Sequence, residues 1–128
     1  MDDPAFLREY ITESIRIATI DRIVNELDAA REAAGLTKAE LARAISTEPA
    51  TVRRLFSSGH VNPTLGTLAE VAAALGMRVV LESLDADARQ EITQSLIEGR
   101  SGDPRGLATR IEELHREHAD PPTEARSR

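Results

Sequence analysis

Two adjacent arginines, Arg53 and Arg54, are the residues best suited to chemistry in this sequence, and they lie in the short stretch PATVRRLF. An arginine guanidinium presents a planar fork of N–H donors that pairs bidentately with phosphate or with a guanine edge. At about 100° per residue, Val52, Leu55 and Phe56 share one face of a helix. Arg54 then lies on the opposite face, so the spacing predicts a short helix that offers arginine to a ligand. The alternative is a solvated arginine face.

Start and stop signals predict two further helices around this one. Thr37 and Glu40 have the spacing of a capping box, and Pro49 stands at the first position of the arginine-bearing helix. A third helix is expected to start at Thr64 and to stop at Gly76. The apolar positions expected to face inward are Leu41, Ala42 and Ile45 in the first helix, Val52, Leu55 and Phe56 in the second, and Leu65, Leu68, Ala72 and Leu75 in the third.

The link between the first two of these helices is very short. Only Ser46, Thr47 and Glu48 separate them, which is too few for an antiparallel hairpin of long helices and is typical of a helix-turn-helix crossing. Ala42 is small enough for the close approach that such a crossing needs. The alternative is an ordinary small helical domain, in which short connections are also common.

With these residues in place, the segment from Thr37 to Gly76 resembles the helix-turn-helix domain of the phage Cro/C1-repressor (XRE) family. TKAELARAI is similar to its first motif helix, PATVRRLF to its recognition helix and NPTLGTLAEVAAALG to the helix that follows. The resemblance covers about a third of the chain and implies a domain that binds double-stranded DNA. The DNA contacts that it implies are Lys38 on phosphate, Pro49, Ala50 and Arg54 at base edges, and Thr51, Arg53 and Ser57 near the DNA backbone.

Three features depart from the pattern of that family. Ser46 occupies the turn position usually held by glycine, where a residue with a side chain is expected to strain the backbone. Pro49 and Ala50 replace polar side chains that often read bases, which leaves direct readout mainly to Arg54. The connection between Ser57 and Asn62 has one extra residue.

The composition of the 128 residues favours one helical domain with at most a small appendage. Apolar residues make up 41% of the chain but aromatic residues only 2%, so the core must be built from Ala, Leu, Ile and Val. The absence of cysteine excludes disulfides and thiolate metal sites. No apolar run approaches the roughly 18 residues of a membrane span, and the start MDDPAFLREY lacks a signal-peptide layout. We expect a soluble cytoplasmic protein with no membrane partner.

The net charge of −6 is unevenly distributed along the chain. Residues 35–84 carry five basic and four acidic side chains, whereas residues 1–34 carry four and eight, and residues 85–128 carry seven and ten. The motif segment is thus the least acidic, as contact with phosphate requires. The acidic flanks suit a basic protein partner, or they simply keep the protein soluble.

The regions on both sides of the motif are expected to be helical. Residues 1–18 form an expected N-terminal helical extension, and residues 19–76 the helix-turn-helix bundle, whose first helix ends at Gly35. The sequence does not decide whether the two are continuous, and we favour extra core over a partner-binding surface for the extension. Residues 85–119 are expected to form C-terminal helices, and residues 120–128 a disordered tail.

One segment after the bundle has the character of a β-strand. Residues 77–84, MRVVLESL, are rich in β-branched residues and partly alternate. A lone strand leaves N–H and C=O groups unpaired, so we expect it to pair with the same strand of a second copy. The alternatives are an extended linker or a helical continuation, and the C-terminal helices could hold a homodimer instead. The expected fold is therefore all-α, a small helical bundle with a lambda-repressor-like helix-turn-helix, one dimerising β-strand and C-terminal helices.

The motifs of common enzymes are missing from the sequence. It contains no glycine-rich phosphate loop, no Gly-x-Ser-x-Gly and no cysteine nucleophile. Glu112 and His115 have the spacing used in helical di-iron sites, but those sites need two such pairs and further glutamates. His60 could approach a phosphate, but we favour an ordinary loop residue. We therefore expect no catalytic residues, no metal and no cofactor.

The function that this sequence favours is a dimeric, sequence-specific DNA-binding repressor. Two-fold symmetry implies a palindromic operator with half-sites about one helical turn apart. The strand-like segment directly after the bundle, the small size and the acidity resemble the HigA-type antitoxins, which implies a small basic toxin as a partner and repression of the chain's own operon. The alternatives are a stand-alone XRE-family repressor, or an interaction protein with a helix-turn-helix shape and no affinity for DNA.

Overall fold

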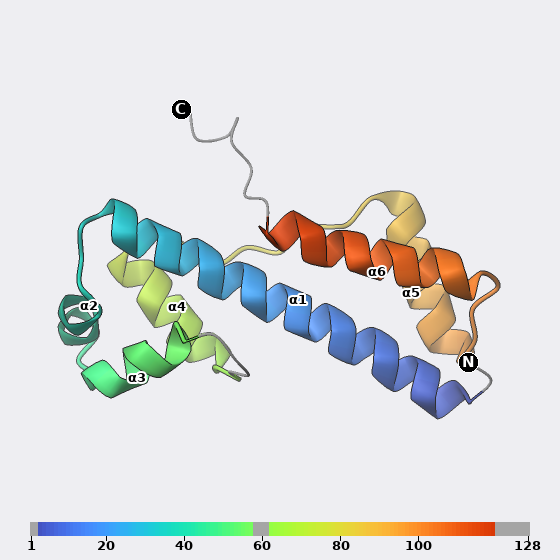
Figure 1. Cartoon of the computed structure of the whole chain (residues 1–128), viewed down its shortest axis with the longest axis horizontal. Helices are drawn as coiled ribbons and strands as arrows, with labels where there is room; N and C mark the ends of the chain where they lie inside the picture. Colours follow the sequence, from blue (N-terminus) through green and yellow to red (C-terminus); the bar gives the residue numbers. More distant parts are fainter. Residues whose placement is uncertain (1–2, 58–61, 120–128) are drawn as a thin grey trace. The chain divides into compact units, whose positions relative to one another are not determined.

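Helices account for all the regular secondary structure in the described part of the chain, residues 3–57 and 62–119 of a computed structural model (Figure 1). This confirms the predicted all-helical class, whereas the predicted tail (120–128) and His60 lie outside the described residues. None of the helices in these described ranges is long and apolar enough to cross a membrane. In chain order they are α1 (Pro4–Ala33), α2 (Lys38–Ala44), α3 (Pro49–Leu55), α4 (Leu65–Ala74), α5 (Ala86–Glu98) and α6 (Pro104–Ala119).

Helix α1 runs without a break for 30 residues, so the extension and the first helix of the bundle are one element. It ends in a Schellman motif. Gly35 has a φ of +74°, its N–H donates to the Glu32 carbonyl at 3.0 Å, and the Leu36 N–H donates to the Arg31 carbonyl at 3.1 Å. The glycine that the sequence marks as a helix stop therefore turns the chain toward α2.

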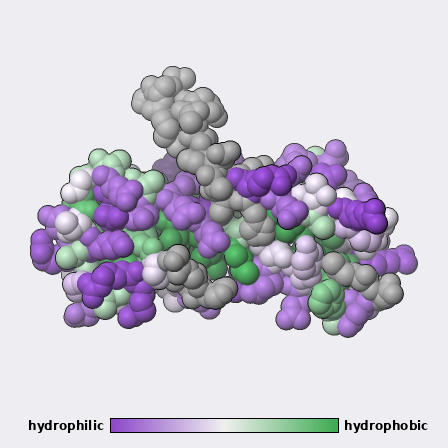
Figure 2. All heavy atoms as spheres, viewed as in Figure 1, coloured by the Kyte–Doolittle hydropathy of each residue, from purple (hydrophilic) through white to green (hydrophobic). Residues whose placement is uncertain are grey.

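The chain divides into two compact units, and α1 contributes to both. The helix-turn-helix unit comprises residues 20–80, and the terminal unit comprises residues 1–19 and 81–128. On the face drawn in Figure 2, hydrophilic side chains predominate, as expected when apolar side chains gather inside. The buried core of the helix-turn-helix unit consists of Val24, Leu27, Leu41, Ala42, Val52, Leu55, Leu68, Val71 and Ala72.

The terminal unit brings the two ends of the chain together around a second core. Leu7 and Ile11 from the start of α1 are buried with Ile92 of α5 and with Leu107 and Ile111 of α6. Apolar spacing predicts the inward positions of each helix, but no local pattern shows that these three stripes pack on one another. The N-terminal extension thus supplies core to the terminal unit, in line with the interpretation that we favour from the sequence.

The structure differs from two sequence expectations within the helix-turn-helix unit and beside it. Leu65 is 69% exposed rather than inward, because it is the first residue of α4 and helical side chains lean toward the N-terminus, here away from the core. The strand expected at residues 77–84 is not seen: this stretch has no regular structure. A strand needs ladder hydrogen bonds from a neighbour, and the described residues supply none to this stretch. Leu81 is instead fully exposed.

Candidate nucleic-acid interface

Helix α2 is fixed at its start by the predicted capping box. The Thr37 Oγ1 accepts from the Glu40 N–H at 3.0 Å, and the Glu40 Oε1 accepts from the Thr37 N–H at 2.8 Å. The hydrogen bond from the Thr37 backbone N–H to the Glu40 carboxylate, and after it one from the Thr37 side chain, hold the pKa of Glu40 below its ordinary value. Leu41 and Ala42 are completely buried, and α2 packs against α3 and α4. The cap and the buried face together set the direction from which α3 departs.

The turn between α2 and α3 passes through Ser46, which has a φ of +55°. The Ser46 N–H donates to the Arg43 carbonyl at 3.1 Å, and the Thr47 N–H donates to the Ala42 carbonyl at 2.9 Å. This is again the Schellman pattern, with serine at the left-handed position that favours glycine. A residue with a side chain costs about 1 kcal/mol there, which confirms the strained backbone expected from the sequence.

Helix α3 presents a buried face and an arginine-bearing face, as the sequence predicts. Val52 and Leu55 are buried, and Phe56 packs partly buried against the same core. Arg53 and Arg54 are exposed, and neither guanidinium forms an ion pair or hydrogen bond within the part of the chain that the structure describes. Helix α3 therefore holds two cationic forks in solvent, which are available to phosphate or base edges.

The seven predicted DNA contacts lie on α3, at its C-terminal end and at the start of α2. Lys38 is the first residue of α2 and is half-buried. Pro49 begins α3, and Ala50 and Thr51 beside it are half-buried. Ser57 is exposed just past the end of α3, where its Oγ donates to the Arg54 carbonyl at 2.8 Å. Their roles toward DNA are predictions.

One residue of this unit that the sequence reasoning missed is Arg31. Its side chain is only 11% exposed, lies in the last turn of α1 and is hydrogen-bonded on several sides. The signal in the sequence would have been its position four residues before Gly35, three after Asp28 and five before Leu36. That spacing places the arginine side chain at a helix C-terminus, within reach of Asp28 one turn earlier and of the Leu36 carbonyl just past the helix.

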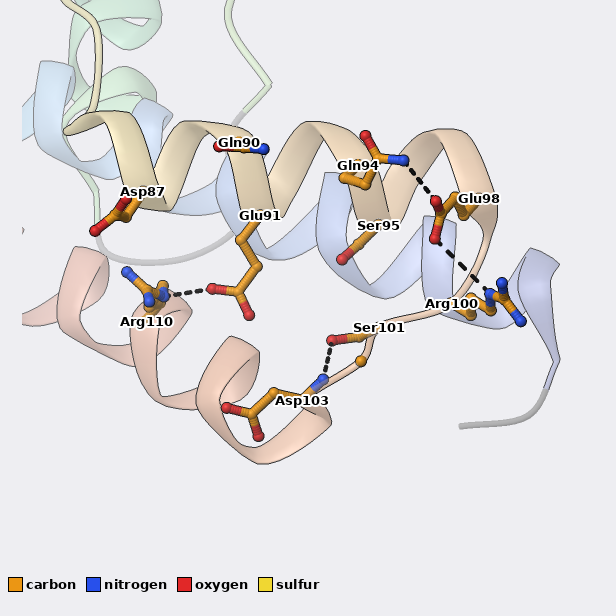
Figure 3. A pocket seen from close by; sticks show the side chains of 11 residues that line it. Asp87, Gln90, Glu91, Gln94, Ser95, Glu98, Arg100, Ser101, Asp103 and Arg110 are labelled. Carbon is orange, nitrogen blue, oxygen red and sulfur yellow. Dashed lines mark hydrogen bonds and ion pairs between the residues drawn. The ribbon is translucent and has the colours of Figure 1, made fainter.

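The terminal unit contains a separate groove of about 390 Å³ between α5 and the start of α6 (Figure 3). Its charged side chains largely satisfy one another: Glu91 forms an ion pair with Arg110, and Glu98 lies 3.7 Å from Arg100. Among the described residues no cluster of histidine and carboxylate side chains could hold a metal ion. The groove therefore gathers ion pairs between its own side chains.

Comparison with known proteins agrees with the geometry of the helix-turn-helix unit. Residues 27–80 match the model of a family described as Helix-turn-helix, and this range contains α2, α3 and α4. No curated protein and no solved structure matched the chain. The match and the arrangement of α2 and α3 support the XRE helix-turn-helix family for this segment. Residues 27–80 are thus a helix-turn-helix domain of the kind that points to a DNA-binding transcription regulator.

Proposed function

We propose that this protein is a sequence-specific DNA-binding repressor that lays α3 into the major groove. The observation that carries the proposal is the pair Arg53 and Arg54, exposed and unpaired among the described residues, on the second helix of a helix-turn-helix. In such domains the second helix contacts base edges in the major groove. Arg54 lies opposite the buried face and is our candidate for a guanine contact. Catalysis forms no part of this proposal.

A homodimer would give this repressor two recognition helices and a palindromic operator. The observation in favour is the apolar stretch Val79 to Leu81, where Val80 and Leu81 are strongly exposed. Pairing with the same stretch of a second copy would cover these side chains and supply the missing ladder partner. Val80→Pro removes one ladder donor and should shift the protein from dimer to monomer in sedimentation, whereas Ser83→Ala should not. A wild-type monomer would rule out this interface.

Binding to DNA is tested by fluorescence anisotropy with the DNA upstream of the chain's own gene and with a random duplex of equal length. We expect tighter binding to the upstream DNA and a fall in affinity with salt, because phosphate contacts release counterions. An interaction protein with a helix-turn-helix shape alone would bind neither duplex. Failure to bind either duplex would therefore rule out the repressor role and favour the interaction protein.

A second candidate is the antitoxin role, in which the repressor also covers a small basic toxin. The exposed carboxylates Glu112 and Glu113 on α6 favour it. The acidic residues of α1 favour it less, since Glu13 pairs with Arg16 and Glu26 with Arg22. The test is co-expression with the product of the neighbouring gene. Toxicity that the wild type relieves and that Glu112→Lys/Glu113→Lys does not relieve would support the role. A harmless product that does not co-purify would leave a stand-alone repressor.

A further inference from the structure

Arg31 links the end of α1 to the end of the proposed recognition helix. Its guanidinium carbon lies 5.9 Å from the centroid of the Phe56 ring, within the range of a cation–π contact. Phe56 is the C-cap residue of α3, and its N–H donates to the Val52 carbonyl at 3.1 Å. Arg54 lies two residues before Phe56, in the same last turn of α3, so the contact restrains the turn that carries the proposed base-reading side chain.

The other contacts of Arg31 hold its guanidinium in place over that ring. Nε donates to the Asp28 Oδ1 at 2.9 Å, and Nη1 donates to the Leu36 carbonyl at 2.7 Å. Nη2 lies 2.9 Å from the same Asp28 oxygen and 3.6 Å from the Glu32 carboxylate. With its nitrogens engaged and its side chain 11% exposed, Arg31 is not available to phosphate. Any influence on DNA must pass through the position of α3.

We propose that Arg31 is a positioning residue for DNA recognition, which fixes the last turn of α3 through the Phe56 ring and so orients Arg54. The inference rests on the proposed function. A bidentate contact with guanine tolerates little angular error, and α3 is a helix of only 7 residues. Its last turn is held by the buried Leu55 and by Phe56, which packs against the same core. The Arg31–Phe56 contact adds a restraint to the turn that carries the side chain that must read a base.

Substitutions that remove the Arg31–Phe56 contact should weaken the preference for operator DNA, and a substitution that keeps the ring should not. Arg31→Met keeps the apolar stem but loses the charged fork, and Phe56→Leu keeps an apolar side chain but loses the ring. Each should lower the ratio of operator to random-DNA affinity about two- to fivefold, as one cation–π contact allows. The double variant should lose no more than either single variant, because both remove one contact. Phe56→Tyr keeps the ring and should keep the ratio.

Arg22→Met is the matched control on the same helix. Arg22 also pairs within one turn, with Glu26 at 3.0 Å, but its side chain is 42% exposed. All variants are compared at a temperature where circular dichroism shows them equally folded. A lower affinity ratio then reports weaker recognition of the operator and not partial unfolding. Arg31→Met and Phe56→Leu variants that keep the wild-type ratio would overturn the inference.

A second measurement decides the inference without DNA. Amide hydrogen exchange of Leu55 and Phe56 should accelerate in Arg31→Met relative to the amides of Leu41 and Ala42 in α2, and should not accelerate in Arg22→Met. If the wild-type protein shows no preference for the operator, the proposed function is ruled out. The exchange rates would still show whether Arg31 holds the end of α3. Unchanged exchange at Phe56 would overturn the positioning role itself.

Discussion

Arg8, near the start of the chain, donates from its Nε to the carbonyl of Leu96 at 2.9 Å and from its Nη2 to the carbonyl of Ile97 at 3.1 Å. One side chain of α1 thus satisfies two carbonyl groups at the end of α5, which a helix leaves without partners. The chain leaves α5 at Gly99, with a φ of +74°. Arg8 thus ties the start of α1 to the end of α5 within the terminal unit.

Gly99→Ala should destabilise the terminal unit because Gly99 has neither the conformation nor the space for a side chain. A Cβ there would stand 2.7 Å from the Cβ of Pro4, in addition to the left-handed backbone. We expect a loss of about 1–3 kcal/mol in the free energy of unfolding, measured by chemical denaturation. Gly102→Ala is the control, since nothing lies within 4 Å of a Cβ at that glycine. Equal effects at the two positions would contradict the packing described.

Ser46→Gly should stabilise the helix-turn-helix unit. Ser46 holds a φ of +55° in the turn between α2 and α3, and glycine adopts that region without the steric cost of a Cβ. We expect a gain of about 0.5–1 kcal/mol as a raised denaturation midpoint. Ser83→Gly, at an exposed position outside the helices, should give no gain. A destabilised Ser46→Gly variant would show that the turn is not strained.

The stability that Glu40 contributes should depend on pH in a definite direction. Hydrogen bonds from Thr37 lower the pKa of Glu40 in the folded protein. A depressed carboxyl pKa contributes stability above the pKa of the unfolded chain, and this is lost as the pH falls through the folded value. Glu40→Gln should therefore differ most from wild type near neutral pH, and the difference should shrink as the pH falls below the ordinary glutamate pKa of about 4.3. Thermal melts at several pH values check this, and a difference that grows toward acid would contradict it.

The local signals in this sequence predict the helix-turn-helix unit well. The capping box at Thr37, the buried faces of α2 and α3 and the strained turn at Ser46 are all confirmed. Each depends on residues within a few positions of one another, where spacing and backbone preference decide the outcome. This is why the resemblance of the same segment to the XRE family and its match to a helix-turn-helix family agree.

The features that the sequence does not predict arise between distant residues. Arg8 meets carbonyls 88 and 89 positions away, and Arg31 meets Phe56 across two intervening turns of the chain. The expected strand at residues 77–84 is not seen, for a related reason. β-Branched residues favour an extended backbone locally, but a strand exists only with a partner. Within the described residues that partner is missing.

The phosphate role predicted for Lys38 and the base-reading role predicted for Arg54 can be distinguished by comparing binding to operator DNA with binding to random DNA. Lys38→Ala should weaken binding to operator and to random DNA alike, and should reduce the salt slope by about one, because a phosphate contact carries no sequence information. Titrations at several salt concentrations measure this slope. A loss confined to the operator would contradict a phosphate role for Lys38.

The central claim is that Arg54 on α3 reads the operator, and the ratio of operator to random-DNA affinity in Arg54→Ala tests it most directly. Anisotropy titrations of wild type and variant, with Arg43→Ala as an exposed control on α2, give that ratio. We expect Arg54→Ala to lose about 1–3 kcal/mol of discrimination and to keep most of its affinity for random DNA. An Arg54→Ala variant that is folded and discriminates as the wild type does would contradict the account.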